Sequence, residues 1–243
     1  MVIAIWGRDG VGKSTLSDTL GVFFEKKGTC IVIDTDLTQP TLAMRQSSEA
    51  KKVMKSPQSL GRALAGTVVT DIRSYLHQHP ANKGLFYAGL QDGDDFLSYE
   101  LGLNALNNAS DFVDRCVEQA DTVILDLSGQ RNDPFLPAAF EAEHIILPII
   151  PDLQGICWYL SVRPLLQSVG AMERVLPVAA LQQLCHYIDG VEKAGEFRFV
   201  SAFPWIREIA ERRDDGLPAI NNRKYVNALL PLLDKLKGSA ADA

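Results

Sequence analysis

Cysteine is scarce in this 243-residue sequence, and no two of the four form a C-x-x-C pair: Cys30, Cys116, Cys157 and Cys185. This spacing argues against a zinc centre and against a disulfide framework, so we expect buried, reduced side chains. No apolar run approaches the roughly 20 residues of a membrane-spanning helix, and no basic leader precedes the first apolar segment. We therefore expect a cytoplasmic protein without a membrane span.

Basic residues do not dominate either, since the formal net charge is −6. This balance argues against a surface coated for nucleic acid, although a local basic patch would survive the average. The sequence shows no internal repeat, and its 47% hydrophobic and 22% charged residues are typical of a globular protein. We predict one domain over residues 1–237 and a disordered tail over residues 238–243.

The most informative stretch lies at residues 2–26. An apolar run leads into G-R-D-G-V-G-K-S-T and then into an amphipathic segment. Strand, glycine-rich turn and helix in this order are the context of a phosphate-binding loop, and the match to G-x-x-x-x-G-K-[ST] is complete. We expect Lys13 to reach the β- and γ-phosphates and Ser14 to ligate Mg²⁺. The predicted nucleotide-binding residues of this loop are Gly7, Arg8, Asp9, Gly10, Val11, Gly12, Lys13, Ser14 and Thr15.

Two further apolar segments end in acidic residues. Residues 30–33 lead into Asp34 and Asp36, and residues 121–125 lead into Asp126. In open α/β sheets, ligands bind at the carboxyl ends of the strands, so these carboxylates are expected to face the nucleotide. Asp126 fits the acid that holds a Mg²⁺-bound water in such enzymes. These patterns predict an α/β fold: an open, mostly parallel, twisted sheet with helices on both faces.

Together these motifs resemble those of the ParA/MinD family of P-loop ATPases, also called deviant Walker A or SIMIBI-type ATPases. The family's loop reads K-G-G-x-G-K-[ST] and its second strand ends in D-x-D, comparable here to residues 34–36. The resemblance implies that Asp36 orients the attacking water, that the Gly129 N–H lies near the γ-phosphate, and that Phe203 and Pro204 lie beside the base. The metal ligands that we predict are Ser14, Asp34, Asp36 and Asp126.

The chain departs from the family pattern at three places. Arg8 aligns with the signature lysine that reaches the partner's nucleotide, and its guanidinium keeps the charge with a changed geometry. Asp9 stands where the family usually has glycine, and the segment 174–181 lacks the asparagine that reads adenine. The implied catalytic residues are Lys13, Asp36 and Arg8, and the departures predict slow turnover.

The resemblance implies an ATP-hydrolysing switch with Mg²⁺, in which two subunits sandwich two nucleotides. Such proteins position or partition plasmids, chromosomes, division machinery or pilus assemblies, with a protein partner that stimulates hydrolysis. We expect a divergent pilus- or partition-associated member.

Two alternatives stay open. One is a P-loop small-molecule phosphotransferase or ligase, with a substrate site near residues 36–60. The other is a nucleotide-binding interaction protein with little hydrolysis. Nonspecific DNA binding also stays open. The basic residues within 43–82 and 207–224 are explained about as well by solvated helical faces as by a surface that binds DNA or a partner.

Local patterns predict several packing elements. Helices are expected at 59–66, 68–77 and 104–119, and strands at 84–90 and 144–150. A helix after residue 152 should break at Pro164. The apolar face of residues 225–236 carries few basic residues opposite it, which favours a helix docked on the core over a membrane-binding one.

Overall fold

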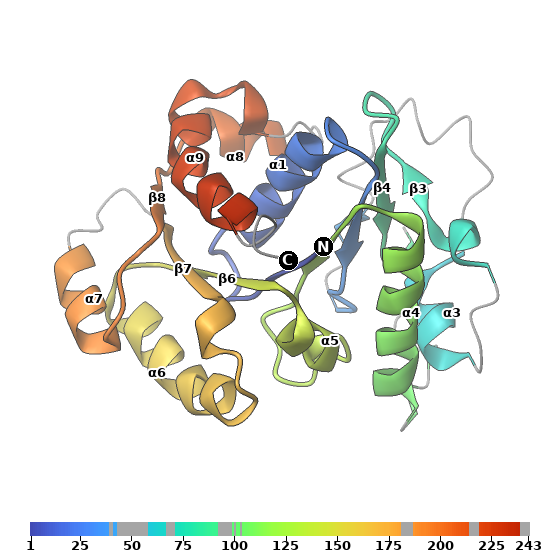
Figure 1. The fold of residues 1–243 in the computed structure, drawn as a ribbon, viewed down its shortest axis with the longest axis horizontal. Helices are drawn as coiled ribbons and strands as arrows, with labels where there is room; N and C mark the ends of the chain where they lie inside the picture. The colour runs from blue at the N-terminus through green and yellow to red at the C-terminus, as the bar shows by residue number, and fades with distance from the viewer. Residues whose placement is uncertain are drawn as a thin grey trace.

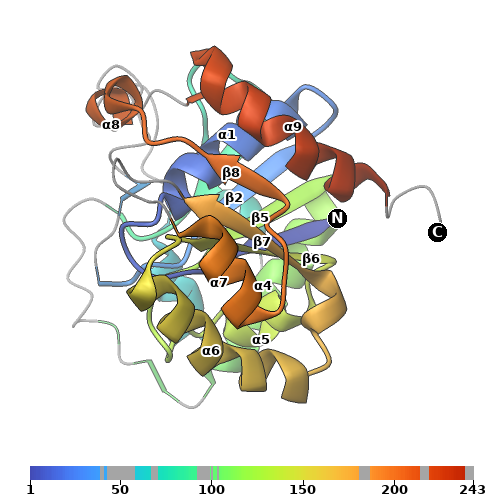
Figure 2. The ribbon, with the colours of Figure 1, turned by 90° about the vertical axis from the view of Figure 1, so that its left-hand side faces the viewer.

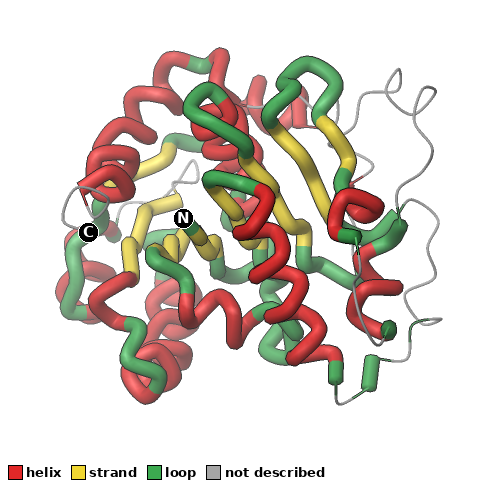
Figure 3. Tube along the Cα trace, turned by 45° about the vertical axis from the view of Figure 1, so that its right-hand side comes forward, coloured by secondary structure: helices red, strands yellow, loops and turns green. Residues whose placement is uncertain are grey.

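The computed structural model describes residues 1–38, 41–42, 58–66, 71–91, 99, 101–102, 104–180, 187–213 and 219–238. These residues form an eight-stranded sheet in the order β3-β4-β2-β5-β1-β6-β7-β8 (Figures 1 and 3). Neighbouring strands are parallel except for β3 and β4, which pair antiparallel. The expected open, mostly parallel α/β sheet is confirmed. The strands are β1 (Val2–Ile5), β2 (Cys30–Asp34), β3 (His77–Gln78), β4 (Leu85–Ala88), β5 (Thr122–Asp126), β6 (His144–Ile149), β7 (Val175–Ala180) and β8 (Ser201–Phe203).

Helices cover both faces of the sheet, as Figure 2 shows. On one face lie α1 (Lys13–Glu25) and α9 (Arg223–Gly238), with the short η5 (Ala219–Asn221) beside them. On the other face lie α3 (Leu60–Ala65), α4 (Ala105–Gln119), α5 (Leu136–Glu141), α6 (Leu153–Ser168) and α7 (Ile188–Gly195). The helix α8 (Arg207–Arg213) follows β8, and the 3₁₀ turns η2 (Ile72–Tyr75) and η4 (Met172–Arg174) precede β3 and β7.

Side chains of each central strand alternate between two hydrophobic cores. In β1, Ile3 and Ile5 pack toward α1 and α9, whereas Ala4 and the following Trp6 pack toward the opposite helices. A period of two along a strand produces this alternation, and burial on both faces explains why these strands are almost uninterrupted apolar runs. The two layers therefore cover both faces of the central strands.

Two local predictions are wrong. Residues 71–78 do not continue a helix: they form η2 and the edge strand β3, whose partner β4 supplies the hydrogen bonds. Residues 67–70 lie outside the described residues. Pro164 does not end α6, which continues to Ser168. Since Pro164 lies on the exposed side of the helix, water can reach the carbonyl group that loses its backbone donor there.

The C-terminal helix docks on the core as predicted, because Tyr225, Leu229 and Leu232 are buried. Within the predicted tail 238–243, Gly238 is the last residue of α9 and residues 239–243 lie outside the described part of the chain. Among the described helices, none is long and apolar enough to cross a membrane.

The thiols follow the expectation only in part. Cys30 and Cys116 are buried, and burial raises the pKa of the Cys30 thiol to about 12. Cys157 is exposed on α6, contrary to the prediction, and Cys185 lies outside the described residues.

Candidate nucleotide-binding site

The glycine-rich loop connects the centre of the sheet to α1. Gly10 and Gly12 adopt positive φ angles of 77° and 85°, a conformation that residues with a side chain rarely adopt. Gly12 is the N-cap of α1 and has no side chain that could cap the first N–H groups of the helix. The amino end of α1 therefore presents backbone N–H groups and the positive end of the helix dipole to the loop, which suits an anion.

Lys13 folds back across this loop. Its ammonium Nζ donates to the carbonyl oxygens of Gly7 at 3.0 Å and Arg8 at 2.9 Å. It also forms an ion pair with Asp9 Oδ1 at 3.2 Å, while the Lys13 side chain is 9% exposed and that of Asp9 is 78% exposed. The negative charge of Asp9 is thus partly balanced by the lysine that the motif assigns to phosphate. An incoming phosphate has to compete with Asp9 for this ammonium.

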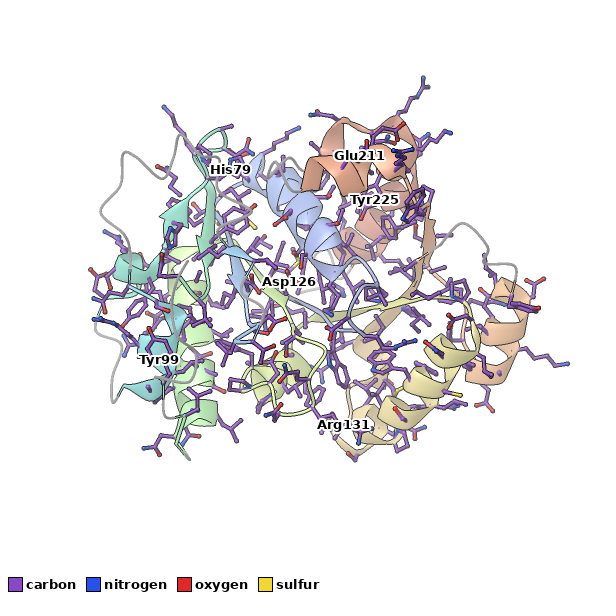
Figure 4. The ribbon with its side chains drawn as sticks, turned by 180° about the vertical axis from the view of Figure 1, so that it is seen from behind. His79, Tyr99, Asp126, Arg131, Glu211 and Tyr225 are labelled. Atoms are coloured by element: carbon purple, nitrogen blue, oxygen red, sulfur yellow. The ribbon has the colours of Figure 1, made fainter. Side chains whose placement is uncertain are left out.

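Strand register brings the two strand-end acids together. Asp126 on β5 lies opposite Ile5 on one side and opposite Asp34 on the other. Both carboxylates are buried, and Figure 4 shows Asp126 near the middle of the molecule. Asp126 and Asp34 therefore lie side by side at the carboxyl ends of adjacent strands, and Asp126 also lies next to the end of β1, where the glycine-rich loop begins.

Asp34 also shapes the segment that follows β2. Its Oδ1 accepts from the Asp36 N–H at 3.2 Å, and its Oδ2 accepts from the Thr41 N–H at 3.2 Å and hydroxyl at 2.8 Å. Asp36 is only partly buried, and its Oδ1 accepts from the N–H of Thr38 at 2.9 Å and from its hydroxyl at 2.8 Å. The two acids thus differ: Asp34 is buried and accepts from Asp36 and Thr41, whereas Asp36 is partly buried and accepts from Thr38.

These groups line one cavity of about 410 Å³, a volume within the range of small-molecule sites. One end is polar and includes the phosphate-binding loop and the three carboxylates. The other end is apolar and is formed by β7, β8, α8 and α9. There the rings of Phe203 and Tyr225 lie 5.0 Å apart between centroids, and Trp205 is 45% exposed. Figure 4 labels Tyr225 on the side of α9. A polar end and an apolar slot together fit the phosphates and base of a nucleotide.

Most of the predicted site residues meet at this cavity. Those that line it are Asp9, Gly10, Val11, Gly12, Lys13, Ser14, Thr15, Asp34, Asp36, Asp126, Phe203 and Pro204. Mg²⁺ prefers oxygen ligands and often takes one or two carboxylates together with substrate phosphates. The Ser14 hydroxyl and the carboxylates of Asp34, Asp36 and Asp126 offer oxygen donors of this kind. The described residues contain no group of three or more His, Cys, Asp or Glu placed to hold a metal by themselves.

Three predicted residues lie beside the cavity rather than in its lining. A methyl group at Gly7 would come within 2.9 Å of the Pro148 carbonyl oxygen, so Gly7 permits close packing on β6. A Cβ atom at Gly129 would lie 2.5 Å from Asp9 Oδ1. The guanidinium of Arg8 points to α6, where its Nη2 donates to Gln154 Oε1 at 2.7 Å.

The sequence motifs did not indicate Asp133, which is buried between the loop that follows β2 and the loop that follows β5. It accepts hydrogen bonds from the Thr35 hydroxyl, from the N–H and hydroxyl of Ser128 at 2.9 and 2.8 Å, and from the Phe135 N–H at 2.9 Å. Burial raises the pKa of this carboxyl, and the four hydrogen bonds oppose that rise. A lone aspartate seven residues after Asp126 matches no motif, so only its contacts reveal it.

No family model and no curated protein sequence matches the chain. Solved structures, however, match over nearly its whole length. MinD of Pyrococcus horikoshii complexed with Mg-ADP is 17% identical, with 98% of this chain and 96% of that chain covered and a TM-score of 0.77. The MinC:MinD complex of Aquifex aeolicus is 15% identical, with 98% of this chain and 96% of that chain covered and a TM-score of 0.75. A putative plasmid partition protein of Borrelia burgdorferi bound to AMPPNP is 14% identical, with 98% of each chain covered and a TM-score of 0.75. The chain has the fold of the ParA/MinD-like ATPases, as the resemblance predicted.

Proposed function

We propose that this protein is an ATP-binding and ATP-hydrolysing molecular switch that forms a nucleotide-sandwich dimer and positions or partitions a cargo. The observation that carries the proposal is that one cavity joins the glycine-rich loop, the carboxylates of Asp34, Asp36 and Asp126, and an apolar slot. The structural neighbours add support: one is complexed with Mg-ADP, one is bound to AMPPNP, and one is complexed with MinC.

Nucleotide binding is assigned to the loop and the slot. Lys13 would exchange Asp9 and the carbonyl oxygens of Gly7 and Arg8 for the terminal phosphates. The base would enter the apolar slot beside Phe203 and Pro204. Mg²⁺, when bound through Ser14 and the carboxylates, would neutralise phosphate charge and polarise the phosphoryl group.

Hydrolysis is assigned to Asp36. Its carboxylate lies in the cavity wall and accepts two hydrogen bonds from Thr38. It can therefore also accept a hydrogen bond from a water molecule at the terminal phosphate and orient that water for attack. Asp126, buried behind it, would keep the metal side of the site negatively charged. Turnover is expected to be slow because Asp9 competes for Lys13.

Dimer formation is assigned to Arg8. In the structure its guanidinium is occupied by the neutral amide of Gln154, a partner that a charged phosphate would replace favourably. If the Arg8 side chain reaches the nucleotide bound by a second copy of the chain, dimer formation depends on ATP. The division-protein and plasmid-partition neighbours favour a cargo of this general class.

The test is the solution mass of the Asp36→Ala protein by light scattering, with and without ATP and Mg²⁺. The expected result is a shift from 26.7 kDa to twice this mass on adding ATP, lost when Arg8→Ala is added. Lys193→Ala, which removes a positive charge from the exposed part of α7, serves as the matched charge control for Arg8→Ala and should dimerise normally when combined with Asp36→Ala. An unchanged mass despite measured ATP binding would contradict the switch and favour a phosphotransferase or a static binding protein.

A further inference from the structure

The loops that follow β2 and β5 are held together by one buried side chain. Asp133 Oδ2 accepts from the hydroxyl of Thr35 in the first loop and from both the N–H and the hydroxyl of Ser128 in the second. Its other oxygen accepts from the Phe135 N–H at 2.9 Å and so anchors the carboxylate at the start of α5. The side chain of Asp133 therefore bridges segments that are almost a hundred residues apart in the chain.

The bridged residues lie close in sequence to acids that line the cavity, and Ser128 follows Asp126 by two residues. Thr35 stands between Asp34 and Asp36, and its N–H donates to the Asp126 carbonyl oxygen at 3.1 Å. The Ser128 N–H also lies 3.0 Å from the Thr35 hydroxyl oxygen. A displacement of either loop therefore disturbs the hydrogen bonds of the other.

A second contact joins the same loops at the surface. Gln130 Nε2 donates to the Thr38 hydroxyl oxygen at 2.8 Å, and that hydroxyl in turn donates to Asp36 Oδ1 at 2.8 Å. The Asp36 carboxylate, to which we assign the orientation of the attacking water, is thus connected to the loop after β5 through Thr38 and Gln130. The surface contact repeats, from the exposed side, the bridge that Asp133 makes from the core.

We propose that Asp133 is a positioning residue that couples the two loops, so that Asp36 and Gly129 move into place together when a terminal phosphate is present. The inference rests on the proposed ATPase function and adds its internal regulation. Hydrogen-bonded networks in a buried setting favour discrete arrangements over gradual ones, because a half-satisfied carboxylate is costly. Coupling requires such a two-state element that both loops bias.

The first test uses Asp133→Asn, which keeps the shape of the side chain but places an amide hydrogen toward one of the donors. We expect kcat for ATP hydrolysis to fall about 10- to 100-fold, as for a misplacement of about 1 Å, with KM changed less than about threefold. Asp121→Asn is the matched control, because Asp121 also accepts a backbone hydrogen bond, from Thr29 at 2.8 Å, but at the amino ends of the strands. An equal loss in the control, or a loss in KM alone, would overturn the assignment.

A double-mutant cycle separates coupling from general weakening. Thr35→Val removes the hydroxyl that Asp133 binds, and it should lower kcat by a similar factor. If the two residues act through one contact, Thr35→Val combined with Asp133→Asn should lose no more than about threefold beyond either single change. Losses that multiply fully would show independent roles and contradict the coupling.

Hydrogen exchange of the nucleotide-free protein tests the bridge without hydrolysis. In Asp133→Asn, amide exchange should rise in both the 34–38 and the 127–135 segments, by about tenfold or more, with α7 unchanged. A rise confined to 127–135 would reduce Asp133 to a cap of its own loop and refute the proposal. If Asp133→Asn fails to fold, Thr35→Val gives the same two-segment readout. An inactive wild-type protein would count against the ATPase, whereas the exchange result would still decide the coupling.

Discussion

Replacing Asp9 by asparagine should tighten ATP binding. Asp9 Oδ1 lies 3.2 Å from Lys13 Nζ and packs against Gly129, the two groups that we assign to the terminal phosphate. The carboxylate therefore occupies part of the environment that a γ-phosphate would take. Asparagine keeps the size of the side chain and removes its charge, so the change isolates electrostatics.

The magnitude follows from the exposure of the pair. Because the Asp9 side chain is 78% exposed, releasing Lys13 from it is worth only about 0.2–1 kcal/mol. Removing the repulsion between this carboxylate and the terminal phosphate adds about 0.8 kcal/mol per pair of charges about 5 Å apart in water. A total of about 1–2 kcal/mol corresponds to roughly 5- to 30-fold tighter ATP binding.

The assay is titration calorimetry of ATP and ADP at low and high salt. The gain should be larger for ATP than for ADP, since ADP lacks the phosphate nearest Asp9, and it should shrink as salt screens the charges. Asp189→Asn, which changes the net charge equally on exposed α7, should leave both affinities unchanged. Unchanged or weaker ATP binding by Asp9→Asn would refute the competition between Asp9 and phosphate.

Three further changes test the site and its support. Lys13→Ala should weaken ATP binding by about 30-fold or more in the same calorimetric assay, because a buried cation is lost; near-normal affinity would contradict its assignment. Asp36→Ala should bind ATP normally yet release no phosphate in a steady-state assay, and normal turnover would remove its catalytic role. Gly155→Ala places a methyl group into the Ile150 carbonyl oxygen at the start of α6, and overpacking of this kind should cost about 1–3 kcal/mol. The melting temperature of Gly155→Ala should therefore fall by about 2–4 °C per kcal/mol. The control is Gly190→Ala on α7, where the added methyl group meets open space, and its melting temperature should not fall. Equal melting temperatures of the two variants would contradict the predicted clash.

Local patterns in the sequence were sufficient to predict a glycine-rich turn between a strand and a helix, and a sheet of buried strands. The glycines at 10 and 12 are needed by backbone angles of a short loop, and the buried strands are continuous apolar runs. Such features depend on neighbours in the chain, so they are visible without the fold. The same local reasoning failed at residues 71–77, where the 3₁₀ turn η2 and the pairing of β3 with β4 replace the expected helix, and at Pro164, where solvent exposure kept the helix intact.

The sequence by itself therefore determined the fold class and the position of the candidate phosphate site. The tertiary structure decided which partners the site residues take. It placed Arg8 on Gln154, 146 residues away, and Asp133 between Thr35 and Ser128, and it brought Asp34 opposite Asp126. Strand register and helix packing set these contacts, and both depend on the whole core rather than on any local motif. That is the physical reason why the glycine-rich loop is evident in the sequence, whereas the bridge between the loops after β2 and β5 exists only in the folded chain.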